Sequence, residues 1–384
     1  LAALLIRKMN DRLGVKWQLR DIFEYPTIEG LAAAGKERET SSGGTAPIKR
    51  HEVSGPVPLS PQQERLWFLH ELEPDKPLYN VLHVLRLKGE YDLSVLMETV
   101  TKFLARHELF RAYIDPDGER PQLSFVDKTG IPVEIVDFKE KDYQSAEDSY
   151  NELLKKELRK PLDFTAYPFI KILIVTFSED LCRICLFVPQ IFTDGWSSEI
   201  FADEIIEIYS RITENRQDLP PLPVQYSDYS IWENNRKNKL TISEELTGFW
   251  KKYLENIPAV HELPLDFPRP KDISGLGGTV NFTLDEDLSF KIRRICSQNH
   301  ITPNVFFLSV FTLLIWKYSS QETIVIGTPY ANREHDELKN VYGYFIRTIP
   351  LRFDVNPSAG VKDWFSYVRE QFLSAWSMSE LGID

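Results

Sequence analysis

The spacing of apolar residues divides the chain into a helical start, a polar stretch and a long mixed region. Residues 1 to 13 carry leucine and methionine side chains at helical spacing, and a second helix is predicted near the capping residue Thr27. The pattern begins inside a helix at Leu1, and the first 34 residues are too few to support a core, so we expect a piece of a longer protein. From Gly35 to Gly55 the composition changes to Lys, Arg, Glu, Thr, Ser and Gly, which is typical of a linker.

Beyond Pro58 the pattern alternates between the two periodicities of helices and strands. A Pro-rich segment at Leu219–Val224 interrupts it, because consecutive prolines exclude both helices and sheet ladders. Helices that segregate onto sheets in two successive halves indicate an α+β protein of two lobes. Strands are expected at Tyr79–Leu87, Phe110–Ile114, Phe169–Phe177, Leu181–Val188 and Thr323–Ile326, and helices at Leu93–Leu104, Ser197–Tyr209, Leu288–Cys296 and Pro303–Tyr318.

Composition and charge narrow the function classes. The formal net charge is -12 and no run of lysine and arginine marks a phosphate-binding face, so nucleic acid is not an expected partner. Three cysteines are too few for a disulfide framework and fit a reducing cytosol, which makes the expected location cytoplasmic. No apolar run approaches the roughly 20 residues of a membrane helix, and no signal peptide is visible, so no membrane partner is expected.

The pair Cys182 and Cys185 has the spacing of zinc ligands, within a predicted strand. Neighbouring strand positions of this spacing point to opposite faces, and no second cysteine pair exists. We therefore expect no metal site.

Five stretches of polar and aromatic residues follow one another in a set order. They are Ser60–Leu69, Arg106–Arg111, Pro189–Ser197, Tyr226–Trp232 and Gly343–Thr348, the last preceded by Ile326–Arg333. In this order they resemble the core motifs of the condensation domains of nonribosomal peptide synthetases. The family patterns at the first four stretches are Ser-x-Ala-Gln-x-Arg-Leu-Trp, Arg-His-Glu-x-Leu-Arg, His-His-x-x-x-Asp-Gly and Tyr-x-Asp-Tyr-x-x-Trp. Ile326–Arg333 resembles the family segment Gly-Thr-Pro-x-Ala-x-Arg.

The resemblance implies a two-lobed, V-shaped fold like chloramphenicol acetyltransferase, with a tunnel between the lobes. It divides the chain into the C-terminal part of a peptidyl carrier domain (1–34), a linker (35–56) and a condensation domain (57–384), whose lobes cover about 57–225 and 226–384 and which is C-terminally incomplete. The implied partners are upstream and downstream peptidyl carrier domains and a neighbouring adenylation domain. No cofactor is expected on this chain itself, since 4'-phosphopantetheine belongs to the carriers and its attachment serine is absent here.

The implied function is amide bond formation between a carrier-bound acyl or peptidyl thioester and the amine of a carrier-bound aminoacyl group. The third motif departs from the family, because Pro189 and Gln190 stand where two histidines are usual. Glutamine cannot act as a general base near neutral pH. The alternative is therefore a catalytically impaired, condensation-like domain that docks carriers or recruits a tailoring enzyme. An epimerising relative would also be expected to carry the missing histidine.

The resemblance assigns roles to individual residues. Asp194 is expected to pair with an arginine, first Arg333 and otherwise Arg347 or Arg352, and the competing interpretation is a solvated turn. Gly195 either brings its amide close to a substrate oxygen or merely forms the turn. The expected catalytic positions are Gln190, Asp194, Gly195 and Arg333, the tunnel positions are Pro189, Trp196, Ser197, Tyr344 and Arg347, and the structural positions are Arg65, Arg106, His107, Arg111, Tyr226, Asp228 and Trp232.

Overall fold

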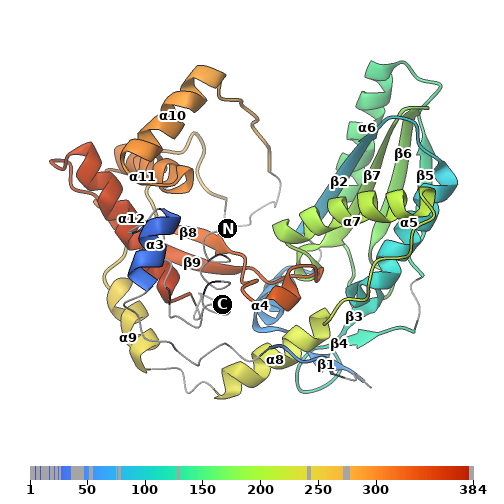
Figure 1. The fold of residues 1–384 in the computed structure, drawn as a ribbon, viewed down its shortest axis with the longest axis horizontal. Coiled ribbons are helices and arrows are strands. Elements are labelled where there is room, and N and C mark those ends of the chain that lie inside the picture. Colours follow the sequence, from blue (N-terminus) through green and yellow to red (C-terminus); the bar gives the residue numbers. More distant parts are fainter. Residues whose placement is uncertain are drawn as a thin grey trace. The chain divides into compact units, whose positions relative to one another are not determined.

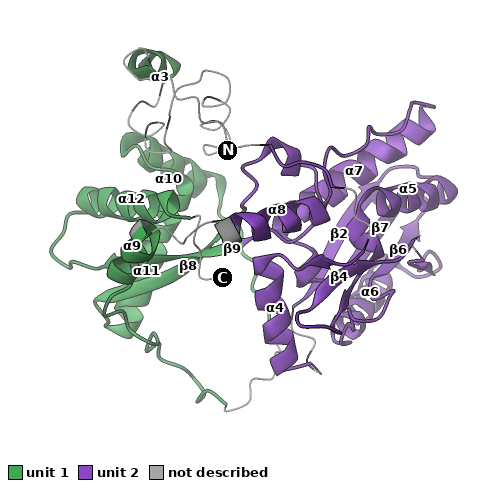
Figure 2. Cartoon of the chain, turned by 90° about the horizontal axis from the view of Figure 1, so that it is seen from below, with its two compact units in different colours: residues 1–46, 242–330, 347–384 green, residues 47–241, 331–346 purple. Residues whose placement is uncertain are grey.

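The chain folds into two compact units (Figure 2). Unit 1 comprises Leu1–Ala46, Ile242–Tyr330 and Arg347–Asp384, and unit 2 comprises Pro47–Thr241 and Ala331–Ile346. The computed structural model describes residues 27–35, 47–51, 55–74, 76, 79–127, 130–239, 244–270 and 277–379, together with the single residues 5, 9, 17, 21 and 25. Most of the helix expected at residues 1 to 13 lies outside the described residues.

Unit 2 is built on a four-stranded sheet with the order β2-β7-β6-β5 (Figure 1). The strands are β2 (Asn80–Lys88), β7 (Leu181–Pro189), β6 (Lys171–Ser178) and β5 (Val133–Asp137), of which only β5 and β6 pair in parallel. Both central strands are buried along almost their whole length, since each sheet face is covered by helices. The sheet therefore forms the rigid support for the turn that follows β7.

Helices cover the two faces of this sheet separately. Helices α5 (Leu93–Arg106) and α7 (Gly195–Thr213) pack on one face, in the core cluster that contains Cys182. Helix α6 (Tyr143–Leu158) packs on the other face, in a cluster that contains Cys185. The two cysteines thus face opposite sides of β7, as predicted from the strand periodicity, and burial raises the pKa of each thiol to about 11.

A smaller sheet and two further helices complete unit 2. The sheet has the order β1-β4-β3, and the helices are α4 and α8. Their bounds are β1 (Val57–Pro58), β4 (Gln122–Phe125), β3 (Ala112–Asp115), α4 (Pro61–Leu72) and α8 (Tyr226–Lys239). Short 3-10 turns lie at η1 (Glu108–Arg111), η2 (Gln190–Phe192) and η3 (Asp336–Leu338).

Unit 1 contains an antiparallel strand pair, β8 (Thr323–Tyr330) and β9 (Arg347–Asp354). Its helices are α3 (Ile28–Gly35), α9 (Glu244–Tyr253), α10 (Glu286–Gln298), α11 (Pro303–Ser319) and α12 (Val361–Ser377). Strand side chains such as Ile349, Leu351 and Phe353 are buried against α11 and α12. Within the described ranges no single helix is long and apolar enough to cross a membrane, although α10 and α11 pass that test as a pair bent by 102°.

The connection between β8 and β9 belongs to the other unit. The chain leaves unit 1 after Tyr330, contributes residues 331–346 to unit 2, and returns at Arg347 to pair with Tyr330. This excursion carries Arg333, so a residue late in the sequence becomes part of the core of unit 2.

The mixed fold of helices and sheets predicted from the pattern is confirmed, and so are most elements. Phe110–Ile114 differs from the expected strand, because a 3-10 turn occupies its first half and the strand begins at Ala112. The cap at Thr27 is present, since its hydroxyl accepts a hydrogen bond from the Gly30 amide at 3.0 Å. Within the stretch expected as a linker, Ile48 is buried in the main core of unit 2.

Candidate active site

Strand β7 ends in a tight turn that leads directly into helix α7. The Gln190 amide donates to the Tyr79 carbonyl at 2.8 Å, and the Thr193 amide donates to the Gln190 carbonyl at 3.0 Å. Asp194 caps α7, because its carboxylate accepts a hydrogen bond from the Ser197 amide at 2.8 Å. A buried strand, a 3-10 turn and a capped helix thus hold the third motif in one conformation.

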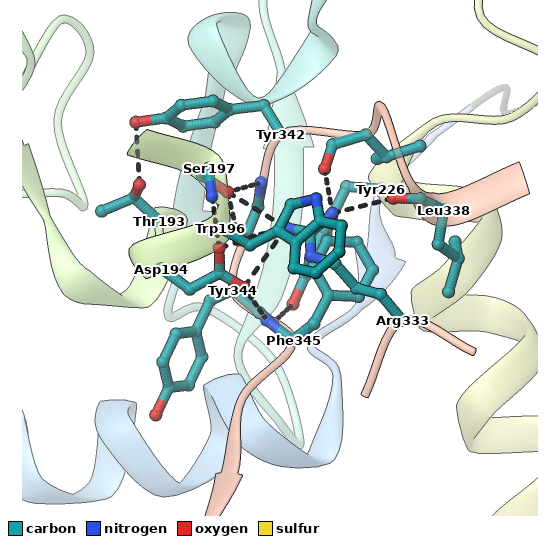
Figure 3. A network of polar contacts seen from close by, with 12 residues as sticks. Thr193, Asp194, Trp196, Ser197, Tyr226, Arg333, Leu338, Tyr342, Tyr344 and Phe345 are labelled. Atoms are coloured by element: carbon teal, nitrogen blue, oxygen red, sulfur yellow. Dashed lines mark hydrogen bonds and ion pairs between the residues drawn. The ribbon is translucent and has the colours of Figure 1, made fainter. Parts of the chain in front are cut away.

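The Asp194 carboxylate forms a buried ion pair with Arg333 (Figure 3). One guanidinium nitrogen lies 3.1 and 3.2 Å from the two carboxylate oxygens, and both side chains are almost completely buried. Another nitrogen of Arg333 donates to the carbonyls of Leu338 and Val341 at 2.8 and 2.5 Å. The Phe345 amide donates to Asp194 at 3.2 Å. Both charges are therefore compensated by several hydrogen bonds, which is the condition for burying an ion pair without a large penalty.

Ser197 ties the same network to the backbone at Gly343. Its hydroxyl contacts the Gly343 carbonyl at 2.9 Å and the Gly343 amide at 3.0 Å, and it accepts a hydrogen bond from Arg333 at 3.1 Å. Gly343 lies against Tyr226, where a Cβ atom would come within 2.1 Å of the ring. The Tyr226 hydroxyl donates to the Tyr344 carbonyl at 2.5 Å. Only glycine fits at the point where the segment 331–346 passes over α8.

Thr193 connects the turn to a buried histidine and a buried tyrosine. Its hydroxyl donates to the Tyr342 hydroxyl at 2.8 Å and lies 2.8 Å from a ring nitrogen of His83. Burial lowers the pKa of His83 to about 4, and the negative charge of Asp194 opposes this shift only in part. His83 is therefore neutral at pH 7 and serves as a hydrogen-bonding partner of the turn.

The part of the chain that carries the five motifs and this network also matches a known family. Residues 53–383 match the model described as the condensation domain. The chain belongs to the condensation domain family. Among its curated relatives are phosphinothricin tripeptide synthetase PhsC of Streptomyces viridochromogenes and malpibaldin synthetase of Mortierella alpina. The first is 29% identical over 87% of this chain and the second 30% identical over 98% of it. The chain spans 31% and 7% of the length of these two relatives.

Solved structures share the fold of this condensation domain. The complex of the X-domain and OxyB from teicoplanin biosynthesis matches with a TM-score of 0.75 and 21% identity, covering 89% of this chain and 75% of that chain. The first condensation domain of the calcium-dependent antibiotic synthetase, in complex with a substrate analogue, matches with a TM-score of 0.72 and 17% identity, covering 85% of this chain and 76% of that one. At these identities the likeness concerns the fold.

Pro189 and Gln190 line a small cavity of this condensation domain. Its volume of about 20 Å³ is enough for one water molecule. His70, in the last turn of α4, lines the same cavity, and its ring packs against Phe164 with centroids 4.3 Å apart. A histidine distant in sequence thus lines the same cavity as Gln190. The other lining residues are Leu66, Leu69, Glu73, Pro74, Lys76, Tyr79, Asn80, Leu162, Phe164 and Ile191.

The expected tunnel residues occupy different environments. The Trp196 indole donates to the Lys339 carbonyl at 2.9 Å, and Tyr344 is buried beside Tyr226. Gly195 is exposed at the first position of α7, with open space where a Cβ atom would stand. Arg347 is buried in unit 1, where it begins β9 and donates to the Ser379 carbonyl at 3.2 Å. Asp194 therefore has its ion-pair partner within unit 2.

The second motif forms a network behind α7. Glu204 accepts hydrogen bonds from Arg106 at 3.0 Å and contacts the His107 ring at 2.8 Å. Burial works against the charged form of Glu204, but these two partners outweigh it and lower the pKa of the carboxyl. Burial lowers the pKa of His107 despite the contact with Glu204. Arg111 donates to the carbonyls of Val126 and Asp127.

The fourth motif begins helix α8. The Asp228 carboxylate accepts hydrogen bonds from the amides of Gln225 at 2.7 Å and His51 at 2.6 Å. Trp232 packs edge-on against His335, with ring centroids 4.8 Å apart. Arg65 of the first motif lies half-buried on α4. Sequence reasoning missed Tyr342, His70 and His83, and the signal that could have identified Tyr342 is its position directly before Gly343.

Proposed function

We propose that this condensation domain joins two carrier-bound groups through an amide bond. The amine nitrogen of a downstream aminoacyl group attacks the carbonyl carbon of an upstream acyl or peptidyl thioester, the C–S bond breaks, and the thiol leaves as the amine loses a proton. The observation that carries the proposal is the family match across residues 53–383. The buried Asp194–Arg333 pair supports it, because it keeps the third motif in a defined conformation.

The proposal includes partners outside the described residues. Both substrates arrive on 4'-phosphopantetheine arms of peptidyl carrier domains, next to an adenylation domain, in the cytoplasm. The first 34 residues would be the end of one carrier, residues 35–56 a linker, and residues 57–384 the condensation domain. Tethering supplies the main rate advantage, because two oriented reactants avoid up to roughly 7–11 kcal/mol of the barrier of a bimolecular reaction.

In this proposal Asp194 and Arg333 position the turn and do not exchange protons with substrate. Gly195 is exposed at the N-terminus of α7, where backbone N–H groups and the helix dipole favour negative charge. Its amide would donate to the oxyanion that develops on the thioester carbonyl. Gln190 would hydrogen-bond the amine through its side-chain oxygen, without accepting the proton.

His70 would accept the proton of the amine. Imidazole is the side-chain group that exchanges protons near neutral pH, and a general base can act through a single water molecule. The cavity shared by His70 and Gln190 has room for one such water. A proton acceptor supplied from α4 would let the domain work without the usual motif histidine.

A condensation assay tests the function. Two carriers, one loaded with an acyl group and one with an amino acid, are mixed with the wild-type chain, with Gln190→His and with Gln190→Ala, and the amide product is quantified by mass spectrometry. We expect product from the wild type and more from Gln190→His. Equal turnover of the wild type and Gln190→His would show that the missing histidine is unimportant. Product from none of the folded proteins would contradict the proposal and favour the docking or recruitment role, which the presence of Pro189 and Gln190 suggests.

A further inference from the structure

A second and larger cavity lies in unit 2, among residues that the proposed chemistry does not use. Its volume is about 460 Å³, within the range of roughly 300–1,000 Å³ that is usual for small-molecule sites. Its walls come from α5, η1 and α7, and from the Pro-rich segment before α8. Arg50, from the stretch before β1, completes the lining.

The cavity is basic in a chain that is acidic as a whole. Five cationic side chains and two acidic ones line it, whereas the formal net charge of the chain is -12. The cationic side chains are Arg50, Lys102, Arg106, Arg111 and Arg211, and the acidic ones are Glu108 and Asp218. Such a concentration of guanidinium groups favours an anionic ligand.

Three of the five cations already have carboxylate partners. Arg106 pairs with Glu204, Arg211 with Glu207, and Lys102 with Asp218 at 2.7 Å. These pairs neutralise much of the charge around the cavity. The basic character that remains available to a ligand comes from the other two arginines.

Arg50 and Arg111 are held by backbone carbonyls instead. Arg50 donates to the Leu222 carbonyl at 3.2 Å, and Arg111 donates to the carbonyls of Val126 and Asp127 at 3.1 and 3.3 Å. Among the described residues, no carboxylate lies within ion-pair distance of either guanidinium. Neutral acceptors thus position both groups without cancelling their charge, which leaves N–H donors for an anion.

The acidic residue of η1 does not close the cavity to anions. One oxygen of Glu108 accepts the Ser227 amide at 2.6 Å, which directs the carboxylate toward the start of α8. Burial raises the pKa of the Glu108 carboxyl. The hydrogen bonds from Ser227 and the charge of Arg111 act in the opposite direction but do not outweigh burial. The remaining lining consists of an apolar wall, formed by Ala105, Ile208, Leu219, Pro221 and Leu222, and of Gln225.

We propose that this cavity binds a small organic phosphate, with its phosphate group at the guanidiniums of Arg50 and Arg111. A phosphate alone fills only part of 460 Å³, and the apolar wall provides a surface for an organic part of the ligand. The fork of N–H donors on arginine matches the oxygens of a phosphate. None of the residues that line this cavity takes part in the proposed condensation chemistry.

Calorimetric titration of the full chain tests this site with four probes: phosphopantetheine, pantetheine, AMP and inorganic phosphate. We expect the organic phosphates to bind and pantetheine, which lacks the phosphate, not to bind. Phosphopantetheine alone would identify a carrier arm as the ligand and AMP alone a nucleotide, while both together would show recognition of the phosphate itself. The proposal would be overturned if neither phosphopantetheine nor AMP bound. It would also be overturned if inorganic phosphate bound as tightly as both of these organic phosphates.

Variants connect the binding to the cavity. Arg50→Gln and the double variant Arg50→Gln/Arg111→Gln are expected to weaken binding at least about tenfold, because each removes a charged donor. Arg159→Gln changes an exposed arginine on the same unit outside the cavity and should bind as the wild type does. A double variant that keeps the wild-type melting temperature and the wild-type affinity would overturn the proposal, and Arg50→Gln alone provides the same test if the double variant unfolds.

Discussion

Arg333 donates hydrogen bonds to both carboxylate oxygens of Asp194, although the two residues are 139 positions apart in the sequence. The pair is enclosed by Phe345, whose ring centroid lies 3.9 Å from the guanidinium carbon. Solvent cannot screen the two charges at this depth, so each depends on the other for compensation. We therefore expect the turn after β7 to keep its conformation only while both partners of the pair are present.

Removing either partner of this pair should destabilise unit 2 strongly. Arg333→Gln leaves the Asp194 carboxylate buried without its cation, at an expected cost of about 3–5 kcal/mol in the free energy of unfolding. Urea unfolding measures this cost. The control is Arg216→Gln, which removes an arginine from an exposed cluster with Glu207 and Glu214 and should cost less than about 1 kcal/mol. Similar losses in the free energy of unfolding of both variants would show that the buried pair contributes no more to stability than the exposed one.

Two glycines of the site should differ in their tolerance of alanine. Gly343→Ala forces a methyl group to within 2.1 Å of the Tyr226 ring, so we expect a loss of at least about 1–3 kcal/mol. Gly195→Ala has open space at the first position of α7 and should leave stability unchanged. Thermal unfolding of both variants checks this. A stable Gly343→Ala protein would mean that the excursion can move away from α8.

The buried His83 should make stability depend on pH. Its pKa is lowered from 6.5 to about 4, so between these values the unfolded chain binds a proton that the folded chain does not. The stabilisation is complete above about pH 6.5 and is lost as the pH falls toward 4, by about 3 kcal/mol in total. His83→Gln, which keeps a hydrogen-bonding group beside Thr193, should flatten this dependence in urea unfolding at pH 4.5 and 7. Because the pKa of His107 is lowered too, some dependence should remain. Identical pH profiles of variant and wild type would rule out this role of His83.

His70→Asn should slow amide formation if His70 accepts the amine proton. The expected loss in the rate of amide formation is roughly 10²-fold at pH 7, measured with two loaded carriers by mass spectrometry. His300→Asn, at an exposed histidine of unit 1, is the matched control and should retain the wild-type rate. A folded His70→Asn enzyme with an unchanged rate would exclude His70 as the proton acceptor without contradicting the condensation function.

The sequence was informative where local pattern determines structure. The predominantly apolar stretches at 169–177 and 181–188 predicted the two central strands, because strands buried on both faces need apolar residues at most positions. The motif order led to the family and to Arg333 as the first-choice partner of Asp194. No periodicity could reveal that residues 331–346 join unit 2, because this depends on packing between segments far apart in the chain. The cavity shared by His70 and Gln190 was hidden for the same reason.

The excursion between β8 and β9 also sets the order in which the protein can mature. A ribosome delivers Asp194 long before Arg333, and domains generally fold from the N-terminus as they emerge. A nascent chain that ends before residue 331 therefore contains every strand of the sheet in unit 2 but lacks the cation that its turn requires. Unit 2 can therefore be completed only after β8 of the other unit has been synthesised, although most of its residues emerge earlier.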